Sequence, residues 1–198
     1  LILSGWEDGC VRTFDEDGRP LWSIQSCHQG PITAMALPTN YRFVLTAGED
    51  GAVRLWEIRT RELISHLKEH GQVVNDLLLF GNDTHALSCS RDRSLLCWDL
   101  RKEKRLTSHT QRMGGMNAVA LSKDETQVIT VGQEKKVTFW DLRAPEPVHQ
   151  TWAAPDAAVT EHPSNEAKCI AVRLVVVLCH WKTRCSCSHM LFAPDIAG

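Results

Sequence analysis

Short apolar runs, separated by turn residues, follow one another along most of this chain. Three of them in one stretch are Ile32 to Leu37, Phe43 to Thr46 and Ala52 to Ile58. Runs of this length that are rich in Val, Ile, Leu and Thr are typical of β-strands rather than helices. The pairs Asp8-Gly9 and Asp50-Gly51 each stand between two such runs, and Asp-Gly is a frequent hairpin sequence. The pattern therefore predicts an all-β fold built from short antiparallel strands.

The same arrangement recurs with a period of 42 residues. An aromatic residue recurs at this spacing, as Phe14, Trp56, Trp98 and Trp140. An acid precedes each aromatic, as Asp8, Asp50, Asp92 and Glu134. A hydroxyl residue precedes each acid, as Ser4, Thr46, Ser88 and Thr130. His28 and His70 lie one period apart, and the apolar Met35, Leu77 and Val119 keep the same phase. Several positions that hold one spacing predict internal repeats, and about four strands per forty-odd residues is the arithmetic of a propeller blade.

Four segments of the chain resemble WD40 repeats. They are Leu3 to Asp15, Leu45 to Glu57, Leu87 to Asp99 and Ile129 to Leu142. The resemblance covers residues 2–155 and implies a partial WD40 β-propeller of three to four blades, each with four antiparallel strands, the first blade being incomplete. We therefore expect WD40 repeats over residues 1–155 and a divergent tail over residues 156–198, a possible remnant of a fifth blade.

The resemblance also implies a structural hydrogen-bond relay within each blade. In the second repeat the relay would join His28, Thr46, Asp50 and Trp56, and in the third His70, Ser88, Asp92 and Trp98. The chemistry agrees, because a buried indole N–H needs an acceptor, a hydroxyl can accept and donate, and a carboxylate can orient an imidazole. A Ser-His-Asp catalytic triad is the alternative reading, but a triad is one site in a cleft and this set recurs. We predict no catalytic residue and no enzyme activity.

The outer repeats carry only part of the relay, namely Ser4, Asp8, Phe14, Thr130, Glu134 and Trp140. Phe14 lacks the indole N–H donor. In the fourth repeat the histidine position is Arg112, and His109 lies nearby but out of phase. We expect the fourth blade to depend on packing rather than on a complete relay.

The last part of the chain does not continue the period. It contains the apolar run Leu174 to Leu178 and a group of metal-ligating residue types, Cys179, His180, Cys185, Cys187 and His189. Their spacing differs from that of paired zinc ligands, although alternate residues of a strand would share one face. Two interpretations of this segment remain, a zinc site and an aberrant tail without a metal, and we favour the second. We predict no metal site and no cofactor.

Composition and charge limit the classes of molecule that we expect the protein to bind. The chain has 198 residues, 43% of them hydrophobic and 23% charged, with a formal net charge of −2. A near-neutral balance without a basic cluster favours neither nucleic acid nor an anionic membrane as a partner. Eight cysteines are irregularly placed, and no secretory leader precedes them, which favours reduced thiols in the cytoplasm. The start without Met predicts that the sequence is a piece of a longer protein.

Function in a propeller lies on its surfaces, so the expected partners are other proteins. Arg112 and Met113, beside Gly114-Gly115, are candidate contact residues on a predicted loop. Within the first repeat and beyond it, Leu3 to Phe14, Asp17 to Leu21 and His28 to Ala36 resemble the cilia- and flagella-associated WD-repeat proteins of the axonemal microtubule doublet. This resemblance implies a non-catalytic structural scaffold in the axoneme, with tubulin or axonemal proteins as partners.

A second resemblance gives an alternative function. Trp98-Asp-Leu-Arg101 and Trp140-Asp-Leu-Arg143 have the Trp-Asp-x-Arg pattern, and Trp56-Glu-Ile-Arg59 nearly has it. This resembles substrate receptors of cullin-4 ubiquitin ligases, in which the arginine would contact the ligase adaptor. Arg101 and Arg143 are therefore further candidate contact residues.

Overall fold

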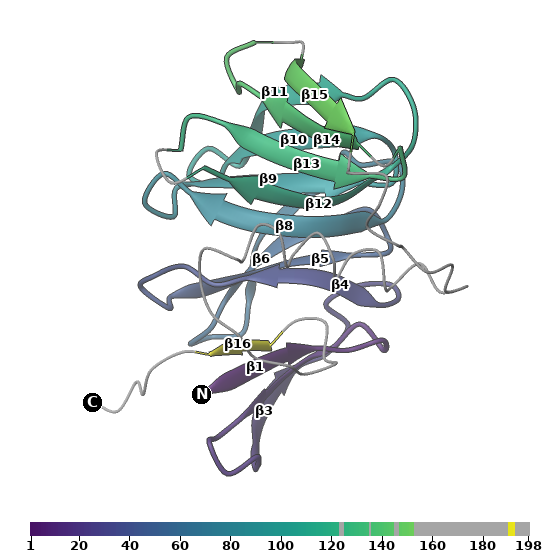
Figure 1. The fold of residues 1–198 in the computed structure, drawn as a ribbon. Helices are drawn as coiled ribbons and strands as arrows, with labels where there is room; N and C mark the ends of the chain where they lie inside the picture. Colours follow the sequence, from purple (N-terminus) through teal and green to yellow (C-terminus); the bar gives the residue numbers. More distant parts are fainter. Residues whose placement is uncertain (123–124, 135, 145–146, 153–189, 193–198) are drawn as a thin grey trace.

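The computed structural model describes residues 1–122, 125–134, 136–144, 147–152 and 190–192 (Figure 1). Within these ranges the regular structure is entirely β, arranged as four antiparallel sheets of four strands each. The all-β prediction is therefore confirmed. Figure 1 shows the sheets stacked one above another, in chain order from the purple N-terminal sheet to the green one.

The four sheets are named here by their order along the chain. The first holds β16 (Met190–Phe192), β1 (Ile2–Gly5), β2 (Val11–Phe14) and β3 (Pro20–Ile24). The second holds β4 (Ile32–Ala36), β5 (Phe43–Gly48), β6 (Val53–Glu57) and β7 (Leu63–Leu67). The third holds β8 (Val74–Phe80), β9 (His85–Ser90), β10 (Ser94–Asp99) and β11 (Lys104–Thr110). The fourth holds β12 (Met116–Leu121), β13 (Val128–Gly132), β14 (Lys136–Trp140) and β15 (Pro147–Trp152).

The sequence period is a period of strand register. The hydroxyl residue of each sheet pairs with the residue eight positions further along, on the neighbouring strand. These pairs are Ser4↔Arg12, Thr46↔Arg54, Ser88↔Leu96 and Thr130↔Thr138. Because side chains alternate between the two faces of a strand, one shared register places equivalent residues on equivalent faces of every sheet.

The apolar core lies between consecutive sheets. Leu3 and Val11 of the first sheet pack with Val44 and Trp56 of the second. The same arrangement joins the second sheet to Trp98 of the third, and the third sheet to Trp140 of the fourth. Each of these tryptophans therefore packs its own sheet against the preceding one. A large aromatic side chain suits this position because it buries much apolar surface.

Polar side chains of the inner strands also link the sheets. The Thr33 hydroxyl on β4 donates to the carbonyl of Val74 on β8. One period later, Asn75 Nδ2 on β8 donates to the carbonyl of Met116 on β12 at 2.6 Å. The carboxylate of the buried Asp76 accepts from the Val119 N–H at 3.1 Å, beside a bulge in β12. The stacking of sheets is thus fixed by hydrogen bonds as well as by apolar burial.

The fourth strand of the first sheet comes from the other end of the chain. Met190 pairs with Ser4, and Leu191 pairs with Leu3, so β16 lies beside β1 (yellow and purple in Figure 1). Met35 pairs with Thr46 in the same way in the second sheet. β16 therefore takes the place that β4, β8 and β12 have in the other sheets. The 190–192 strand falls in the segment that the repeat pattern does not cover; the five candidate zinc ligands and Leu174 to Leu178 lie outside the described residues.

Candidate functional site

The second sheet brings its four relay residues into one hydrogen-bonded chain. Trp56 Nε1 donates to Thr46 Oγ1 at 3.1 Å. His28 Nε2 lies 2.8 Å from the same oxygen, and His28 Nδ1 lies 2.9 Å from Asp50 Oδ1. A carboxylate can only accept, so the proton belongs on Nδ1 and Nε2 accepts from the hydroxyl. The order is therefore indole, hydroxyl, imidazole and carboxylate.

The third sheet repeats this arrangement. Trp98 Nε1 donates to Ser88 Oγ at 2.8 Å, and His70 Nε2 lies 2.8 Å from that oxygen. His70 Nδ1 lies 3.1 Å from Asp92 Oδ2. Two sheets with different hydroxyl residues thus build the same chain, because the register rather than the individual side chain fixes the geometry.

The strand order explains how residues far apart in sequence meet. Thr46 lies on β5 and Trp56 on the adjacent β6, while Asp50 occupies the turn between these strands. His28 lies in the loop that leads from the first sheet into β4. The Asp50 carboxylate accepts from the backbone N–H of Ala52 within its turn and of Gln29 in that loop. The relay therefore also ties the incoming loop to the turn.

A further side chain joins each relay, and sequence reasoning missed both. In the second sheet Arg54 Nη1 donates to Asp50 Oδ2 at 2.7 Å and to the Cys27 carbonyl at 3.0 Å. In the third sheet Leu96 stands in place of Arg54, and Ser94 Oγ lies 2.9 Å from His70 Nδ1. A signal for the arginine was present, because Asp8 and Arg12 repeat the spacing of Asp50 and Arg54 one period earlier and also form an ion pair.

Burial and hydrogen bonding fix the charge states. Burial lowers the pKa of His28 and of His70, and the neighbouring carboxylates only partly oppose this effect. Burial alone would raise the pKa of Asp50, but the bonds from His28 and Arg54 bring it well below its usual range. The pKa of Asp92 is lowered in the same way, against burial, by bonds from Ser94 and from the Gly71 N–H. Near neutral pH the relays hold neutral imidazoles and charged carboxylates.

The distances within each relay resemble those of a catalytic triad of hydroxyl, histidine and carboxylate. The solvent accessibility of the hydroxyl distinguishes the relay from such a triad. Thr46 and Ser88 have no exposed surface, and each hydroxyl already accepts from an indole N–H. A nucleophile must be reachable by the atom it attacks, within hydrogen-bond range of its base. No substrate can approach either hydroxyl without removing a tryptophan from the core. The arrangement holds the fold together and has no route to acyl transfer.

The fourth sheet keeps one link of the relay. Trp140 Nε1 donates to Thr130 Oγ1 at 2.7 Å, but the histidine position is the exposed Arg112. His109 is buried on β11, where its ring lies 5.6 Å from the Trp140 ring. It pairs with Leu95 as Leu67 pairs with Val53, so it fills an apolar outer-strand position rather than the relay position. Glu134 forms an ion pair with Lys136 at 3.6 Å.

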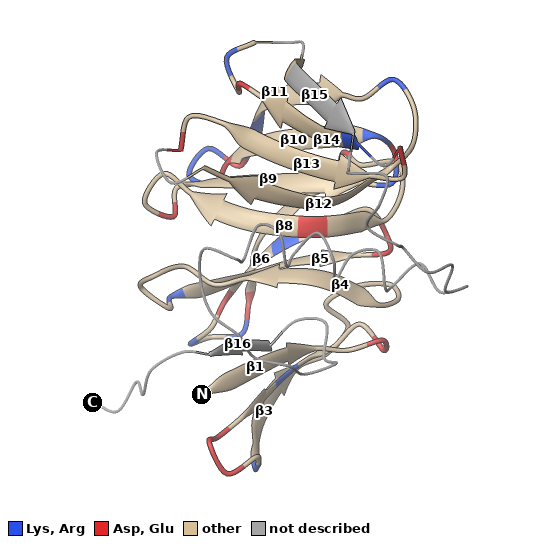
Figure 2. Cartoon of the chain, viewed as in Figure 1, with Lys and Arg blue, Asp and Glu red and all other residues tan. Residues whose placement is uncertain are grey.

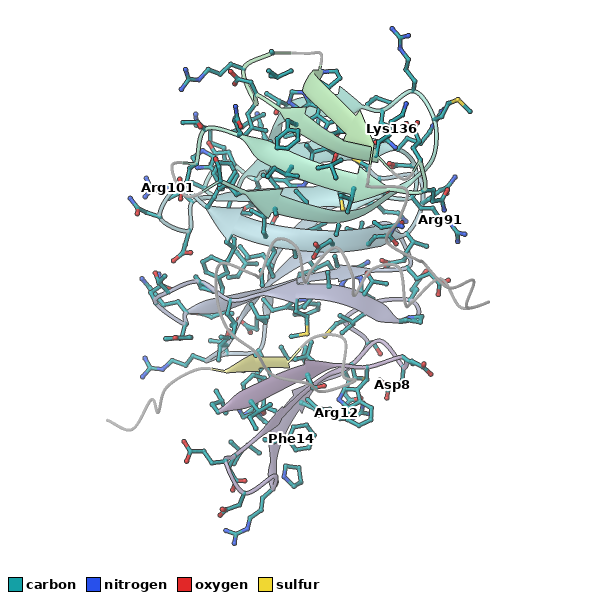
Figure 3. All side chains as sticks on the ribbon, in the orientation of Figure 1. Asp8, Arg12, Phe14, Arg91, Arg101 and Lys136 are labelled. Carbon is teal, nitrogen blue, oxygen red and sulfur yellow. The ribbon has the colours of Figure 1, made fainter. Side chains whose placement is uncertain are left out.

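The first sheet keeps the carboxylate but not the indole. Phe14 ends β2 and has no N–H to donate, while Ser4 pairs with Arg12 in the strand ladder. The bond from Arg12 lowers the pKa of Asp8 to about 2. The Arg12 guanidinium also lies over the Trp6 ring, 4.7 Å from its centroid. Figure 3 shows Asp8, Arg12 and Phe14 together at the lower end of the molecule.

The candidate contact residues lie on two different rims. We call the rim that carries the relay loops and the turns of Asp8, Asp50 and Asp92 the relay rim. Arg112 and Met113 are exposed on this side, in the loop between β11 and β12. Arg101 lies on the opposite rim; Figure 3 places it and Arg91 at opposite edges of the molecule.

Arg101 and Arg143 share one local structure on that opposite rim. Both are exposed, and the backbone N–H of each donates to the carboxylate of the Asp two residues before it, at 3.0 Å for Arg101 and 2.9 Å for Arg143. Arg59 is also exposed, after Glu57 rather than Asp. The two Trp-Asp-x-Arg segments thus present their arginines in equivalent turns.

Three further properties bear on ligands. Among the described residues, no group of three or more His, Cys, Asp or Glu is arranged to hold a metal ion. Cys10, Cys27 and Cys97 are buried free thiols. Over the same described ranges no helix has the length and apolar character needed to cross a membrane.

Comparison with known families agrees with this architecture. The family described as WD40, WD domain, G-beta repeat matches residues 18–57 and 61–99. The chain therefore contains two WD40 repeats, its four-stranded sheets are consistent with the blades of a partial WD40 propeller, and WD40 repeat domains are typically non-catalytic. Each match begins just before the outer strand of one sheet and ends in the third strand of the next, so each matched repeat ties two blades together. No curated protein matches the chain significantly. The finer likeness to ciliary WD-repeat proteins stays a prediction.

Proposed function

We propose that this chain is a non-catalytic scaffold for protein interactions that serves as a structural component of the axoneme of cilia and flagella. The observation that carries the scaffold function is the fate of the repeated polar residues. His, Ser or Thr and Trp are buried in relays that end on a half-buried Asp, as His70, Ser88 and Trp98 show for the buried members. The polar residues that recur with the period therefore stabilise the fold. Recognition of partners depends instead on the exposed side chains of the two rims.

The axonemal part rests on the resemblance of the first blade to ciliary WD-repeat proteins. Its carriers include Phe14 in place of tryptophan and the sequence that leads into β3. This blade exposes apolar side chains, among them Trp6 at 45% and Leu21 at 53%. Apolar side chains on an exposed outer strand supply contact area for a neighbouring protein in a fixed assembly.

Co-sedimentation with purified axonemal doublet microtubules tests this proposal. The chain is expected to pellet with doublets in a saturable manner and to stay in the supernatant without them. Replacing Leu21 by Glu, on the exposed outer strand, should weaken the binding, whereas Leu106→Glu provides a matched change on the exposed outer strand of the third sheet. Absence of saturable binding to doublets would remove the axonemal role and leave the scaffold function standing.

A second function is favoured by the paired arginines of the opposite rim. We propose as the alternative that Arg101 and Arg143 dock the chain on the adaptor of a cullin-4 ubiquitin ligase, making it a substrate receptor. What supports this is that two Trp-Asp-x-Arg segments hold exposed arginines in the same turn. An arginine presented by a rigid turn suits an interface, because its planar guanidinium loses little freedom on binding.

Copurification with the ligase adaptor decides this alternative. Binding should be lost in the double variant Arg101→Ala with Arg143→Ala. The matched control is Arg112→Ala with Met113→Ala, which removes exposed side chains from the relay rim and should leave adaptor binding intact. Adaptor binding that survives the first double variant would exclude the arginine docking mode.

A further inference from the structure

A pocket on the relay rim lies where the third and fourth sheets meet. Its volume is about 570 Å³, and it is lined by Gly71, Gln72, Arg91, Asp92, Arg93, Gly114, Gly115 and Gln133. All of these belong to turns and loops, so the pocket is formed by the rim itself and not by the core. Two of its lining side chains, Arg91 and Arg93, are exposed guanidinium groups.

The fold does not demand an arginine at position 91. The backbone N–H of Arg91 donates to the Val73 carbonyl at 2.9 Å. Glu49 makes the same bond to the Pro31 carbonyl, and Gln133 makes it to the Gly115 carbonyl, both at 3.0 Å. One backbone site thus carries a negative, a positive and a neutral side chain in three consecutive blades. The backbone bond therefore does not determine the charge of the side chain at this site, and the charge can serve recognition.

Position 93 is held against local backbone preference. Arg93 has φ of 73°, in the left-handed region, where the earlier blades have Gly9 and Gly51 at 74° and 73°. A residue with a side chain is disfavoured there, and such residues cluster at functional sites. Arg93 Nη1 donates to the Arg112 carbonyl at 3.2 Å, which places its guanidinium against the loop between β11 and β12. The guanidinium group therefore lies between this loop and the pocket that Arg93 lines.

The acids around the pocket are already engaged. Asp92 accepts from His70, Ser94 and the Gly71 N–H, and Glu134 is paired with Lys136. Arg112, exposed beside Arg93, adds a third cation. In Figure 2 the turns of the third and fourth sheets along this edge carry both blue and red, whereas the turn of the first sheet at the lower right is red. At the position of Arg91 the side chain is negative in the first two blades, as Glu7 and Glu49, and positive or neutral in the last two, as Arg91 and Gln133.

The structure also fixes the wall of the pocket. Gly115 approaches Arg91 so closely that a Cβ at position 115 would lie 2.9 Å from the Arg91 Cα. Gln111 Nε2 donates to the carbonyls of Met113 and Gly114, at 2.7 and 3.1 Å, and so holds the loop closed on itself. Two guanidinium groups on a rigid frame lose little freedom when they bind a carboxylate.

We infer that this pocket binds an acidic segment of a partner protein, with Arg91 and Arg93 pairing with its Asp or Glu carboxylates. Arginine suits this task, because its planar donors match a carboxylate in a two-bond geometry. The segment would approach over the last two blades and be repelled by Glu7 and Glu49 of the first two. The inference rests on the proposed scaffold function and names the chemistry of one partner.

Fluorescence anisotropy of a labelled polyglutamate peptide with the full chain tests the inference. At an ionic strength of about 0.1 M, where the screening length is about 10 Å, the chain should bind the peptide saturably, and the double variant Arg91→Glu with Arg93→Gly should bind at least about tenfold more weakly. This variant carries the residues that the second blade has at the same sites, so its fold should be preserved. Arg91→Gln, which copies the fourth blade, gives a second and milder loss if the double variant does not fold.

The control is Arg101→Glu, which makes the charge reversal of Arg91→Glu on the opposite rim, beyond the range of screened charges. It should change peptide affinity by less than about twofold. An equal loss in Arg101→Glu, no binding by the unmodified chain, or complete displacement of the peptide by millimolar inorganic phosphate would each overturn the inference. Any of these results leaves sedimentation with doublets unaffected, so the two proposals fail separately.

Discussion

The second and fourth sheets have the same strand register but hold their tryptophans by different means. In the second, the Trp56 indole enters a chain of four side chains that ends on Asp50. In the fourth, the Trp140 indole meets Thr130 and the chain stops, because Arg112 has replaced the histidine. Both tryptophans are buried. Packing alone therefore places the indole, while the relay adds a bond between the blade and the loop that enters it.

Removing the hydroxyl from each sheet should give the largest contrast. Thr46→Val keeps the shape of the side chain but leaves two buried groups, the Trp56 N–H and His28 Nε2, without their partner. Thr130→Val leaves only the Trp140 N–H. At about 1–3 kcal/mol for each buried group without a partner, Thr46→Val should cost about twice as much free energy of unfolding as Thr130→Val. Urea denaturation measures both, and equal losses would mean that the relay adds nothing beyond the indole bond.

Substitution at the histidine position should give a somewhat smaller contrast. His70→Ala leaves the Ser88 hydroxyl without an acceptor and Asp92 without its imidazole, and should cost about 1–3 kcal/mol of the free energy of unfolding. Arg112 occupies the same register in the fourth sheet but is exposed, so Arg112→Ala should stay within about 0.5 kcal/mol of the parent chain. Thermal melts of both variants check this. A comparable loss in Arg112→Ala would show that position 112 supports its blade after all.

Acid should loosen the relay-bearing sheets first. The folded chain keeps His28 and His70 neutral, with pKa values below the ordinary one, so the unfolded chain binds more protons once the pH falls below about 6.5. Their contribution to stability is therefore full above that pH and is lost as the pH falls toward the folded-state pKa. The lowered pKa values of Asp50 and Asp92 add a second loss at lower pH, below about 4. Hydrogen exchange across a pH series should show β5 and β9 losing protection before β13.

The smallest effect is expected in the turns of the relay rim. Arg93→Gly relieves a left-handed backbone conformation and should raise the free energy of unfolding by about 1 kcal/mol or less, since glycine also gains freedom in the unfolded chain. Gly51→Ala at the matching position should destabilise, because its Cβ would lie 2.7 Å from the His70 carbonyl oxygen. A destabilising Arg93→Gly would assign the arginine to the fold and weaken its assignment to recognition.

The relay residues could be found in the sequence because each is tied to a strand register that repeats. Thr46, Asp50 and Trp56 recur one period later as Ser88, Asp92 and Trp98, and the structure joins both sets. Arg54 and Ser94 were not predicted from the sequence, because each occurs in only one complete relay. The period predicts which positions converge, but it does not predict which extra side chain will satisfy a carboxylate in a given blade.

The parts that sequence reasoning missed depend on contacts between distant strands. A three-residue strand such as Met190–Phe192 carries no periodic signal, and its place follows from the free edge of β1. Asp76 stands in the register of the buried Ala34 and Ala118, so it reads as an interruption of an apolar strand. Its role appears only in the structure, where its carboxylate accepts from the Val119 N–H of the next sheet. The arginine pocket likewise joins turns of two blades.

The central claim is a directional chain that runs from the tryptophan to the carboxylate, and the protonation of His70 tests it most directly. In the third sheet Leu96 replaces the arginine that lies close to His28 Nδ1 in the second, which makes His70 the clearer case. Nitrogen-15 NMR of the imidazole near neutral pH distinguishes its two nitrogens. The chain requires a proton on Nδ1, facing Asp92, and none on Nε2, which accepts from Ser88. A proton on Nε2, or a charged imidazolium, would contradict the chain.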